Sequence, residues 1–261
     1  MSSEKVWRVI LGPILLLVAS FLIYLLRYPL WWAVPFVEQI FLMLILSYGA
    51  VLILALFLLR YDSKSSLTLF KKTRYVWVLV GLIFALLYLG LWYLISFILS
   101  SRFEITAFPN LTGYEAYVVY SLPLAFILYL AFTVFGAFAE EFAYRGYVQT
   151  RISSRFGYIV GILVAALLFS LQHIHVFQPN WIVEFFQTQF VHVLLFGIFT
   201  GYLFFKSHEN IWSVFTFHAV INAFNVTAPI LVITTFPFAN QIASILSFIL
   251  IIAILKFLKS T

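Results

Sequence analysis

Cysteine is absent from this chain of 261 residues. Its absence excludes disulfide bonds, a thiol nucleophile, a cysteine-based zinc site and palmitoylation, and it leaves the cellular compartment undetermined. Charge is also scarce, because only 9% of the residues are charged, against about 25% in an ordinary soluble domain. Since 64% of the residues are hydrophobic, one water-facing globule of this length could not hide them. We therefore expect lipid to cover much of the surface.

Nucleic acid is excluded as a partner despite the formal net charge of +6. The basic residues fall between apolar segments and form no stripe on a soluble face. No repeat or low-complexity segment interrupts the chain, and its longest polar stretch, residues 60–74, is predicted to be a loop. The short polar N-terminus runs into an apolar segment without a convincing cleavage site, which predicts a retained first helix. We expect a single membrane-embedded domain over residues 1–261.

Long apolar segments predict an all-α fold, a polytopic bundle of about eight transmembrane helices. A spanning helix needs about 20 mostly apolar residues. The fourth segment is too long to be wholly buried, and its end at 144–156, with three arginines, is predicted to leave the membrane. The seventh is short and polar, so we expect it inside the bundle. The predicted spans are residues 9–26, 36–59, 75–99, 117–150, 157–173, 182–205, 211–226 and 229–256.

The distribution of lysine and arginine gives an independent test of topology, because these residues collect in cytoplasmic loops. With eight spans, one set of loops and ends holds 13 of the 15 lysines and arginines, and the opposite set holds two, Arg27 and Arg102. This split predicts that both termini are cytoplasmic. It fits a plasma membrane and an endoplasmic reticulum membrane equally well.

Ionisable groups inside the predicted spans are the candidates for chemistry, because a charge in hydrocarbon costs several kcal/mol, of order 3 on insertion scales. Glu141 and Arg145 are four residues apart, with the acid nearer the N-terminus, which favours an ion pair on one helix face. Glu140 points about 100° away from Glu141, so it is able to face a cavity while its neighbour is structural. The alternative without a catalytic role is that both acids are interfacial charges at a helix end. The ionisable groups that loop ends do not explain are Glu140, Glu141, His173, His192 and His218, with Glu184 nearer an end.

The depth of His173 follows from helix geometry. The predicted turn between its helix and that of Glu140 lies near residues 153–157. Both residues are then about 16 positions, or about 24 Å, from the turn, if the helix from Glu140 is continuous. In an antiparallel hairpin they would face one another. The alternative is a loop histidine beside His175.

His218 and Asn222 are also four residues apart, so both point to one side of a helix. Buried polar groups need partners, which predicts either a site or an interhelical hydrogen bond that only joins helices. Glu184, Thr188 and His192 share a face in the same way, but we favour a structural role for them and assign them none in catalysis. His175 and His208 are interpreted as loop residues.

Three of these patterns together resemble the CPBP family, which includes the type II CAAX prenyl endopeptidases and bacterial Abi-type proteins. Each pattern alone is loose, but all three in order in a chain with eight predicted spans are specific. The resemblance covers about residues 115–226, the motif-bearing core, and the first three predicted spans carry no motif. The matching residues are Glu140-Glu141-x-x-x-Arg145, Phe169-x-x-x-His173 and His218-x-x-x-Asn222.

The resemblance implies a hydrolase that cleaves a peptide bond in a membrane-associated substrate. By that resemblance Glu140 and His173 would activate water, while His218 and Asn222 would stabilise the oxyanion. The remaining pair, Glu141 and Arg145, would hold the helix and tune the site. The partners would be membrane lipids and a lipidated or membrane-associated peptide or protein.

Metal dependence is open at this stage, because family members are described both as metalloproteases and as glutamate-dependent proteases. Glu140, His173 and His218 could together bind zinc, but the spacing is not the His-Glu-x-x-His pattern of a single chelating helix. Our hypothesis is that no tightly bound metal is obligatory and that no cofactor is needed.

Two readings outside catalysis are also open. The polar residues could join helices in a non-enzymatic scaffold or interaction protein of the same fold. They could instead form the relay of a transporter, although the sequence lacks two corresponding halves with broken helices. The sequence does not identify the substrate. A prenylated CAAX protein, another lipidated peptide, a signal-peptide remnant and a bacteriocin-related precursor are all compatible with it.

Overall fold

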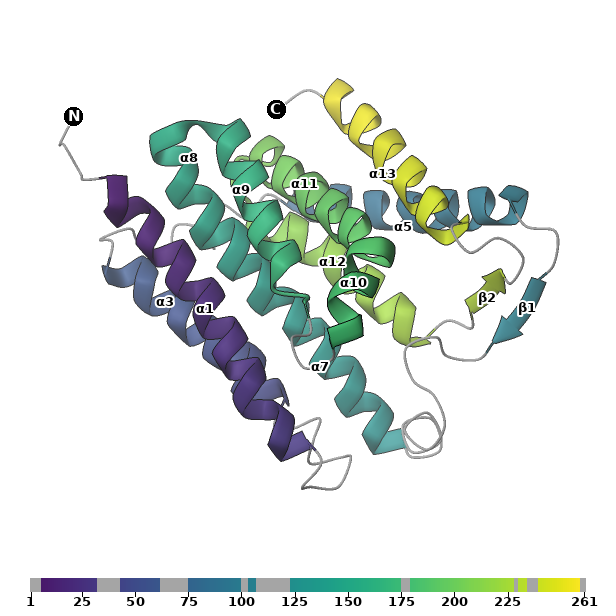
Figure 1. Ribbon diagram of the computed structural model, residues 1–261. Coiled ribbons are helices and arrows are strands. Elements are labelled where there is room, and N and C mark those ends of the chain that lie inside the picture. Colours follow the sequence, from purple (N-terminus) through teal and green to yellow (C-terminus); the bar gives the residue numbers. More distant parts are fainter. Residues whose placement is uncertain are drawn as a thin grey trace.

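The computed structural model describes residues 6–31, 43–61, 75–99, 103–106, 123–174, 179–227, 230–233 and 239–258. Helices make up nearly all of this part, as the apolar segments predicted, and one pair of short strands is added (Figure 1). The elements are α1 (Val6–Trp31), η1 (Met43–Gly49), α3 (Ala50–Tyr61), α5 (Tyr75–Leu99), β1 (Phe103–Thr106), α7 (Pro123–Glu141), η2 (Phe142–Gln149), α8 (Thr150–Phe156), α9 (Tyr158–Leu171), α10 (Pro179–Thr188), α11 (Phe190–Lys206), α12 (Ile211–Thr227), β2 (Ile230–Ile233) and α13 (Ala239–Phe257).

The long helical run from α7 through η2 to α8 contacts α1, α3, α9, α11 and α12 (Figure 1). α12 lies between α5 and α7, and α11 packs against α9 and α13. α1 and α3 lie side by side against the η2 part of the run, while α13 packs on α5. The polar helix α12 is therefore inside the bundle, as its composition predicted, with Phe217 and His218 buried.

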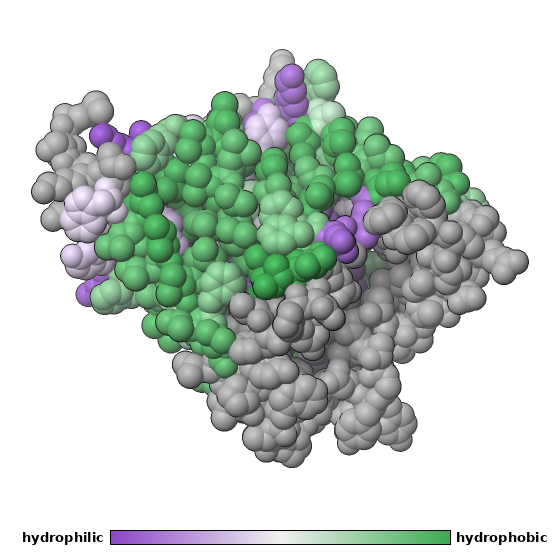
Figure 2. Space-filling view, viewed as in Figure 1, coloured by the Kyte–Doolittle hydropathy of each residue, from purple (hydrophilic) through white to green (hydrophobic). Residues whose placement is uncertain are grey.

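The described surface is largely apolar, which suits contact with lipid. Hydrophobic side chains cover most of the described surface that is visible in Figure 2, and exposed leucine, isoleucine and phenylalanine occur on α1, α5, α9 and α13. By length and composition, two described helical segments are able to cross a bilayer, Tyr75–Leu99 and Phe126–Phe156. Five shorter apolar helices accompany them: Val9–Ile23, Leu46–Tyr61, Tyr158–Leu171, Phe190–Lys206 and Gln241–Phe257.

The third predicted span coincides with α5, but the sixth, 182–205, is not one helix. It is divided at Gln189 into α10 and α11, because Gln189 has φ −117° and ψ −32°, which departs from helical values. Apolar residues continue on both sides of this break, so hydrophobicity alone predicted a single span. α11 alone has 17 residues, about 25 Å of helix.

The eighth predicted span, 229–256, begins about ten residues too early. Ile230–Ile233 forms β2, which pairs antiparallel with β1 so that Phe103 lies opposite Ile233. A run of β-branched residues favours an extended chain, and Pro237 lacks the backbone N–H that a helix interior requires. The all-α prediction therefore missed this small sheet.

The first residues of the fourth predicted span, 117–150, lie outside the described residues, and its described part is not a regular α-helix throughout. The described helix runs from Pro123, a residue type that suits a first helical turn, and it widens into a π-helix over η2. Every residue of η2 is buried and Arg151 is 6% exposed, so neighbouring helices pack the arginines at 145 and 151, whereas residues 154–156 are exposed. That the end at 144–156 leaves the membrane stays a prediction.

Candidate active site

The C-terminal end of α7 and the start of η2 carry an acid–base pair in the bundle interior. Glu141 and Arg145 both have side chains that are 0% exposed, and Arg145 Nε lies 3.1 Å from Glu141 Oε2. The spacing of four residues predicted this ion pair. A buried charge is stable only when it is paired and hydrogen-bonded, so each of these side chains requires the other.

Arg145 is also held by two neighbouring helices. Its guanidinium donates from Nη2 to Thr200 Oγ1 and to the Gly197 carbonyl oxygen of α11, at 3.3 Å for the latter. On its other side the guanidinium carbon lies 4.6 Å from the centre of the Phe169 ring of α9. Glycine at 197 permits this close packing, because a Cβ there would lie 2.9 Å from Ala166 Cα. Arg145 therefore fixes η2 to α9 and α11 at one point.

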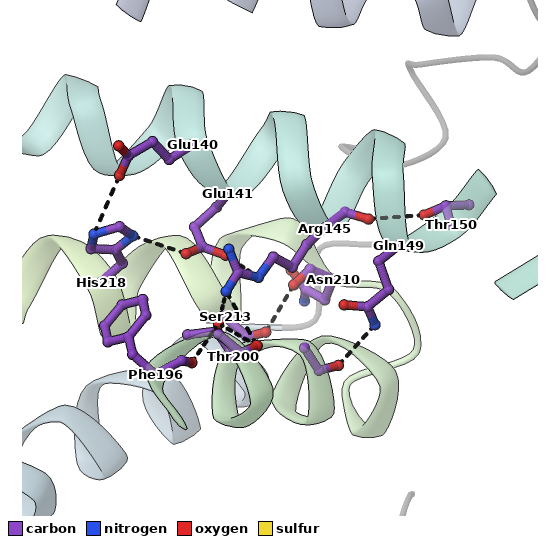
Figure 3. Close-up of polar contacts among 12 residues, drawn as sticks. Glu140, Glu141, Arg145, Gln149, Thr150, Phe196, Thr200, Asn210, Ser213 and His218 are labelled. Atoms are coloured by element: carbon purple, nitrogen blue, oxygen red, sulfur yellow. Dashed lines mark hydrogen bonds and ion pairs between the residues drawn. The ribbon is translucent and has the colours of Figure 1, made fainter. Parts of the chain in front are cut away.

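His218 of α12 lies between the two carboxylates, as Figure 3 shows. Its Nδ1 is 2.8 Å from Glu141 Oε1, and its Nε2 is 3.7 Å from Glu140 Oε2. An ionised carboxylate only accepts hydrogen bonds, so Nδ1 carries the hydrogen that is donated to Glu141. The imidazole packs edge-on against Phe196, with ring centres 4.7 Å apart. Nε2 is thereby directed at Glu140.

Glu140 contacts α9 through a residue that the sequence did not single out. Gln172 Nε2 donates to Glu140 Oε1 at 3.1 Å. Helix α9 ends at Leu171, and His173 follows in a turn, where its Nδ1 donates to the Phe169 carbonyl oxygen at 2.8 Å. The end of α9 thus reaches the level of Glu140, as the helix lengths predicted.

His173 stays near the other site residues through the ring of Phe169. The ring centres of His173 and Phe169 are 4.8 Å apart, and those of Phe169 and His218 are 6.1 Å apart. Because Nδ1 of His173 donates to a carbonyl oxygen, the neutral ring has an unprotonated Nε2, the form that a base requires.

Asn222 lies one turn beyond His218 and faces the same neighbour, α7. Its Nδ2 donates to the Thr133 carbonyl oxygen at 3.2 Å. His218 and Asn222 therefore share a helix face, as their spacing predicted. The Asn222 amide nitrogen has two N–H groups, so one of them serves Thr133.

His192 belongs to a separate polar cluster that joins three helices. Its Nδ1 is hydrogen-bonded to Ser244 Oγ of α13, which also lies 3.1 Å from Tyr88 Oη of α5. This agrees with the structural role favoured from the sequence. His208 lies in the turn after α11 with φ 58°, so it is a loop residue as predicted, whereas His175 lies outside the described residues. For Glu184 only the backbone, within α10, is described.

Within the described ranges, no three histidine or acidic side chains are grouped so that they could hold a metal ion. The conditional ligand set of Glu140, His173 and His218 stays a prediction. The His173 Nδ1 is directed at its own helix end, and Glu140 and His218 face each other.

Several residues that build the site were not among the sequence candidates: Thr133, Gln149, Gln172, Phe196 and Thr200. Gln149 could have been found, because it continues the spacing of four from Glu141 and Arg145, and its Nε2 donates to the Gly201 carbonyl oxygen at 2.9 Å. The others lie on partner helices, and their contacts depend on how those helices pack.

Comparison with known proteins shows which family the site-bearing segment resembles. Residues 122–224 match the family model described as Type II CAAX prenyl endopeptidase Rce1-like. No curated protein matches the chain. The matched segment extends from α7 to α12 and contains all three sequence motifs, so the family recognition made from them is confirmed. Together with the apolar helices, the match identifies a membrane protein. Residues 122–224 of the chain are thus similar to the Rce1-like type II CAAX prenyl endopeptidase family.

Proposed function

We propose that this protein is an intramembrane endopeptidase that hydrolyses a peptide bond in a membrane-associated, prenylated CAAX-type substrate. The observation that carries the proposal is the buried cluster of Glu140, Glu141, Arg145 and His218, in which α12 brings an imidazole between two carboxylates of α7. The cluster lies within the segment that matches a prenyl endopeptidase family. We carry the family activity over to the chain on these two grounds.

In the proposed reaction Glu140 accepts a proton from water as the water oxygen bonds to the carbonyl carbon. His173, whose neutral ring has an unprotonated Nε2, would share that proton with Glu140. When the C–N bond breaks, the proton passes to the leaving amine. One water is consumed, and a carboxyl and an amine product form.

His218 and Asn222 are the proposed donors to the oxyanion that forms during attack. The protonated His218 ring would present an N–H from Nε2, while Nδ1 stays bonded to Glu141. Asn222 would use the amide N–H that does not serve Thr133. Such donors are worth about 10²–10³ in rate each, since they act where charge develops.

Charge balance supports separate roles for the two acids. With His218 protonated, the negative charges of Glu140 and Glu141 equal the positive charges of Arg145 and His218. Glu141 is contacted by Arg145 Nε at 3.1 Å and by His218 Nδ1 at 2.8 Å. Glu141 is thus the structural acid, whereas Glu140 is nearer to solvent, with a side chain that is 12% exposed.

A substrate with a lipid tail suits a site of this kind, because the tail could remain in the bilayer while the peptide reaches the carboxylate. The proposal includes eight spans in one domain, with both termini cytoplasmic, in a plasma membrane or an endoplasmic reticulum membrane. Membrane lipids and lipidated peptides or proteins are the proposed partners.

A cleavage assay on matched peptides tests the activity and the substrate class. The purified protein in proteoliposomes is incubated with one CAAX-terminated peptide in farnesylated and unmodified forms, and mass spectrometry identifies any bond that is cut. We expect cleavage of the farnesylated form at least tenfold faster. Equal rates for the two forms would contradict the proposed preference for a lipidated substrate. If neither form were cleaved, the proposed endopeptidase activity would be contradicted.

A non-enzymatic scaffold is the second candidate, and the contacts of Asn222 and Arg145 favour it specifically, because both connect helices. In that case Glu140→Gln would leave the biological function intact. Loss of function in a folded Glu140→Gln variant would exclude the scaffold.

A further inference from the structure

We propose that Gln172 is a positioning residue of the active site, which holds the Glu140 carboxylate so that one of its oxygens faces His218. The inference deepens the proposed hydrolase and rests on it. Gln172 belongs to none of the three motifs, and the structure alone singles it out.

The two oxygens of Glu140 have different partners from different helices. Gln172 Nε2 donates to Oε1 at 3.1 Å from the end of α9, and His218 Nε2 lies 3.7 Å from Oε2 on the side of α12. Fixing Oε1 fixes the plane of the carboxylate, because the two oxygens move together. A general base needs this orientation, since small misplacements of a reacting group cost large factors in rate.

The neighbouring acid shows the same arrangement with a different partner. Glu141 also directs one oxygen to His218, but its other oxygen is paired with the cation Arg145. A neutral amide orients Glu140 without compensating its charge. The amide thus leaves Glu140 as the acid that can accept a proton, whereas Glu141 is paired with Arg145 and is structural.

The turn after α9 places this amide. Gln172 has φ −62° and ψ −21°, and its N–H still bonds to the Leu168 carbonyl oxygen at 3.1 Å. The next residue, His173, is tied back to Phe169. Consecutive side chains therefore have different contacts. Gln172 donates to Glu140 of α7, and His173 packs against the ring of Phe169.

Gln172→Met tests the proposal, because methionine keeps the length and removes the donor. On a farnesylated CAAX-terminated peptide in proteoliposomes, we expect kcat to fall about tenfold, since the carboxylate loses the donor that orients it, with KM within twofold of wild type. Gln187→Met, at an exposed position of α10, is the matched control and is expected to change neither value. Wild-type kcat in Gln172→Met would overturn the proposal, as would a loss confined to KM.

A thermal unfolding cycle tests the contact without relying on activity. It compares wild type, Gln172→Met, Glu140→Ala and the double variant in detergent. We expect Gln172→Met to lower the unfolding temperature in the wild-type background and to have little effect when Glu140 is already absent. Equal shifts in both backgrounds would overturn the proposal. If wild type cut no peptide, the proposed hydrolase would fail, while this cycle would still decide whether Gln172 holds Glu140.

Discussion

His218 is the residue that organises the site, because it contacts both adjacent carboxylates at once. Glu141 orients the ring from Nδ1, and Nε2 is thereby directed at Glu140. Removing Glu141 or Arg145 would thus disturb the chemistry indirectly, through the position of His218. Residues that never touch a substrate are expected to matter nearly as much as those that do.

Arg145→Met is expected to destabilise the fold strongly, because it leaves the fully buried Glu141 with one cation fewer. Breaking a buried pair in this way costs about 3–5 kcal/mol. Thermal unfolding in detergent checks the prediction, with Arg155→Met as the control, since Arg155 is exposed. Equal unfolding temperatures for the two variants would contradict the role given to Arg145. Adding Glu141→Gln to Arg145→Met should recover part of the loss.

Asn222→Leu is expected to lower kcat by about 10²–10³ if the amide donates to the oxyanion. The Thr133 carbonyl would lose a donor in the same variant, so the unfolding temperature must be measured beside the rate. A purely structural role predicts a lower unfolding temperature with kcat per folded molecule unchanged. That result would remove Asn222 from the catalytic set.

Spacing along one helix predicted the site contacts that stay within that helix. Four-residue intervals gave the Glu141–Arg145 pair and the shared face of His218 and Asn222, because helix geometry fixes them. Spacing did not predict the contact of Gln172 with Glu140, since that depends on where α9 ends and how its turn is oriented.

At the scale of elements, the bundle depends on a few close approaches between helices. η2 is a π-helix, a form often associated with functional sites, and it carries Arg145 toward α11. Elsewhere α5 and α12 approach so closely that a Cβ at Gly81 would lie 2.1 Å from the Ser213 carbonyl oxygen. Apolar runs predicted the rough place of most described helices, but not the break at Gln189 or the strands. They were missed because the hydrophobicity of a segment does not determine where its backbone dihedral angles change.

Gly81→Ala is expected to destabilise the protein, because a backbone oxygen of α12 cannot move aside as a flexible side chain could. Gly90→Ala in the same helix meets no atom within 4 Å and replaces a poor helix former, which favours the helix by about 1 kcal/mol. Unfolding temperatures of the two variants should therefore move in opposite directions. A shift of the same sign and size would contradict the close packing of α5 on α12.

At the scale of the whole molecule, a family segment is surrounded by helices that carry none of its motifs. The match ends at residue 224 and begins at 122, yet α5 and α13 pack on α12 and α11, and α1 packs on η2. A Cβ at Gly12 of α1 would lie 1.8 Å from Tyr147 Oη. The outer helices thus support the site, although the sequence motifs gave no sign of it.

The proposed topology is testable with single cysteines, because the natural chain has none. Ser2→Cys, Ser66→Cys and Thr261→Cys should be shielded from a membrane-impermeant maleimide in intact cells, and Ser101→Cys should react. Labelling after permeabilisation is the control for each. Reaction of either terminus in intact cells would contradict an even number of spans with both ends cytoplasmic.

The initial rate of cleavage by wild type and by Glu140→Ala, measured side by side on the same farnesylated peptide, is the most direct test of the hydrolase. Both proteins must first show the same oligomeric profile and comparable unfolding temperatures. The arrangement of Glu140 between Gln172 and His218 predicts that the variant loses at least 99% of the rate, about 2.7 kcal/mol or more in transition-state stabilisation. A folded Glu140→Ala protein that cleaves the peptide at the wild-type rate would contradict the assignment of this site.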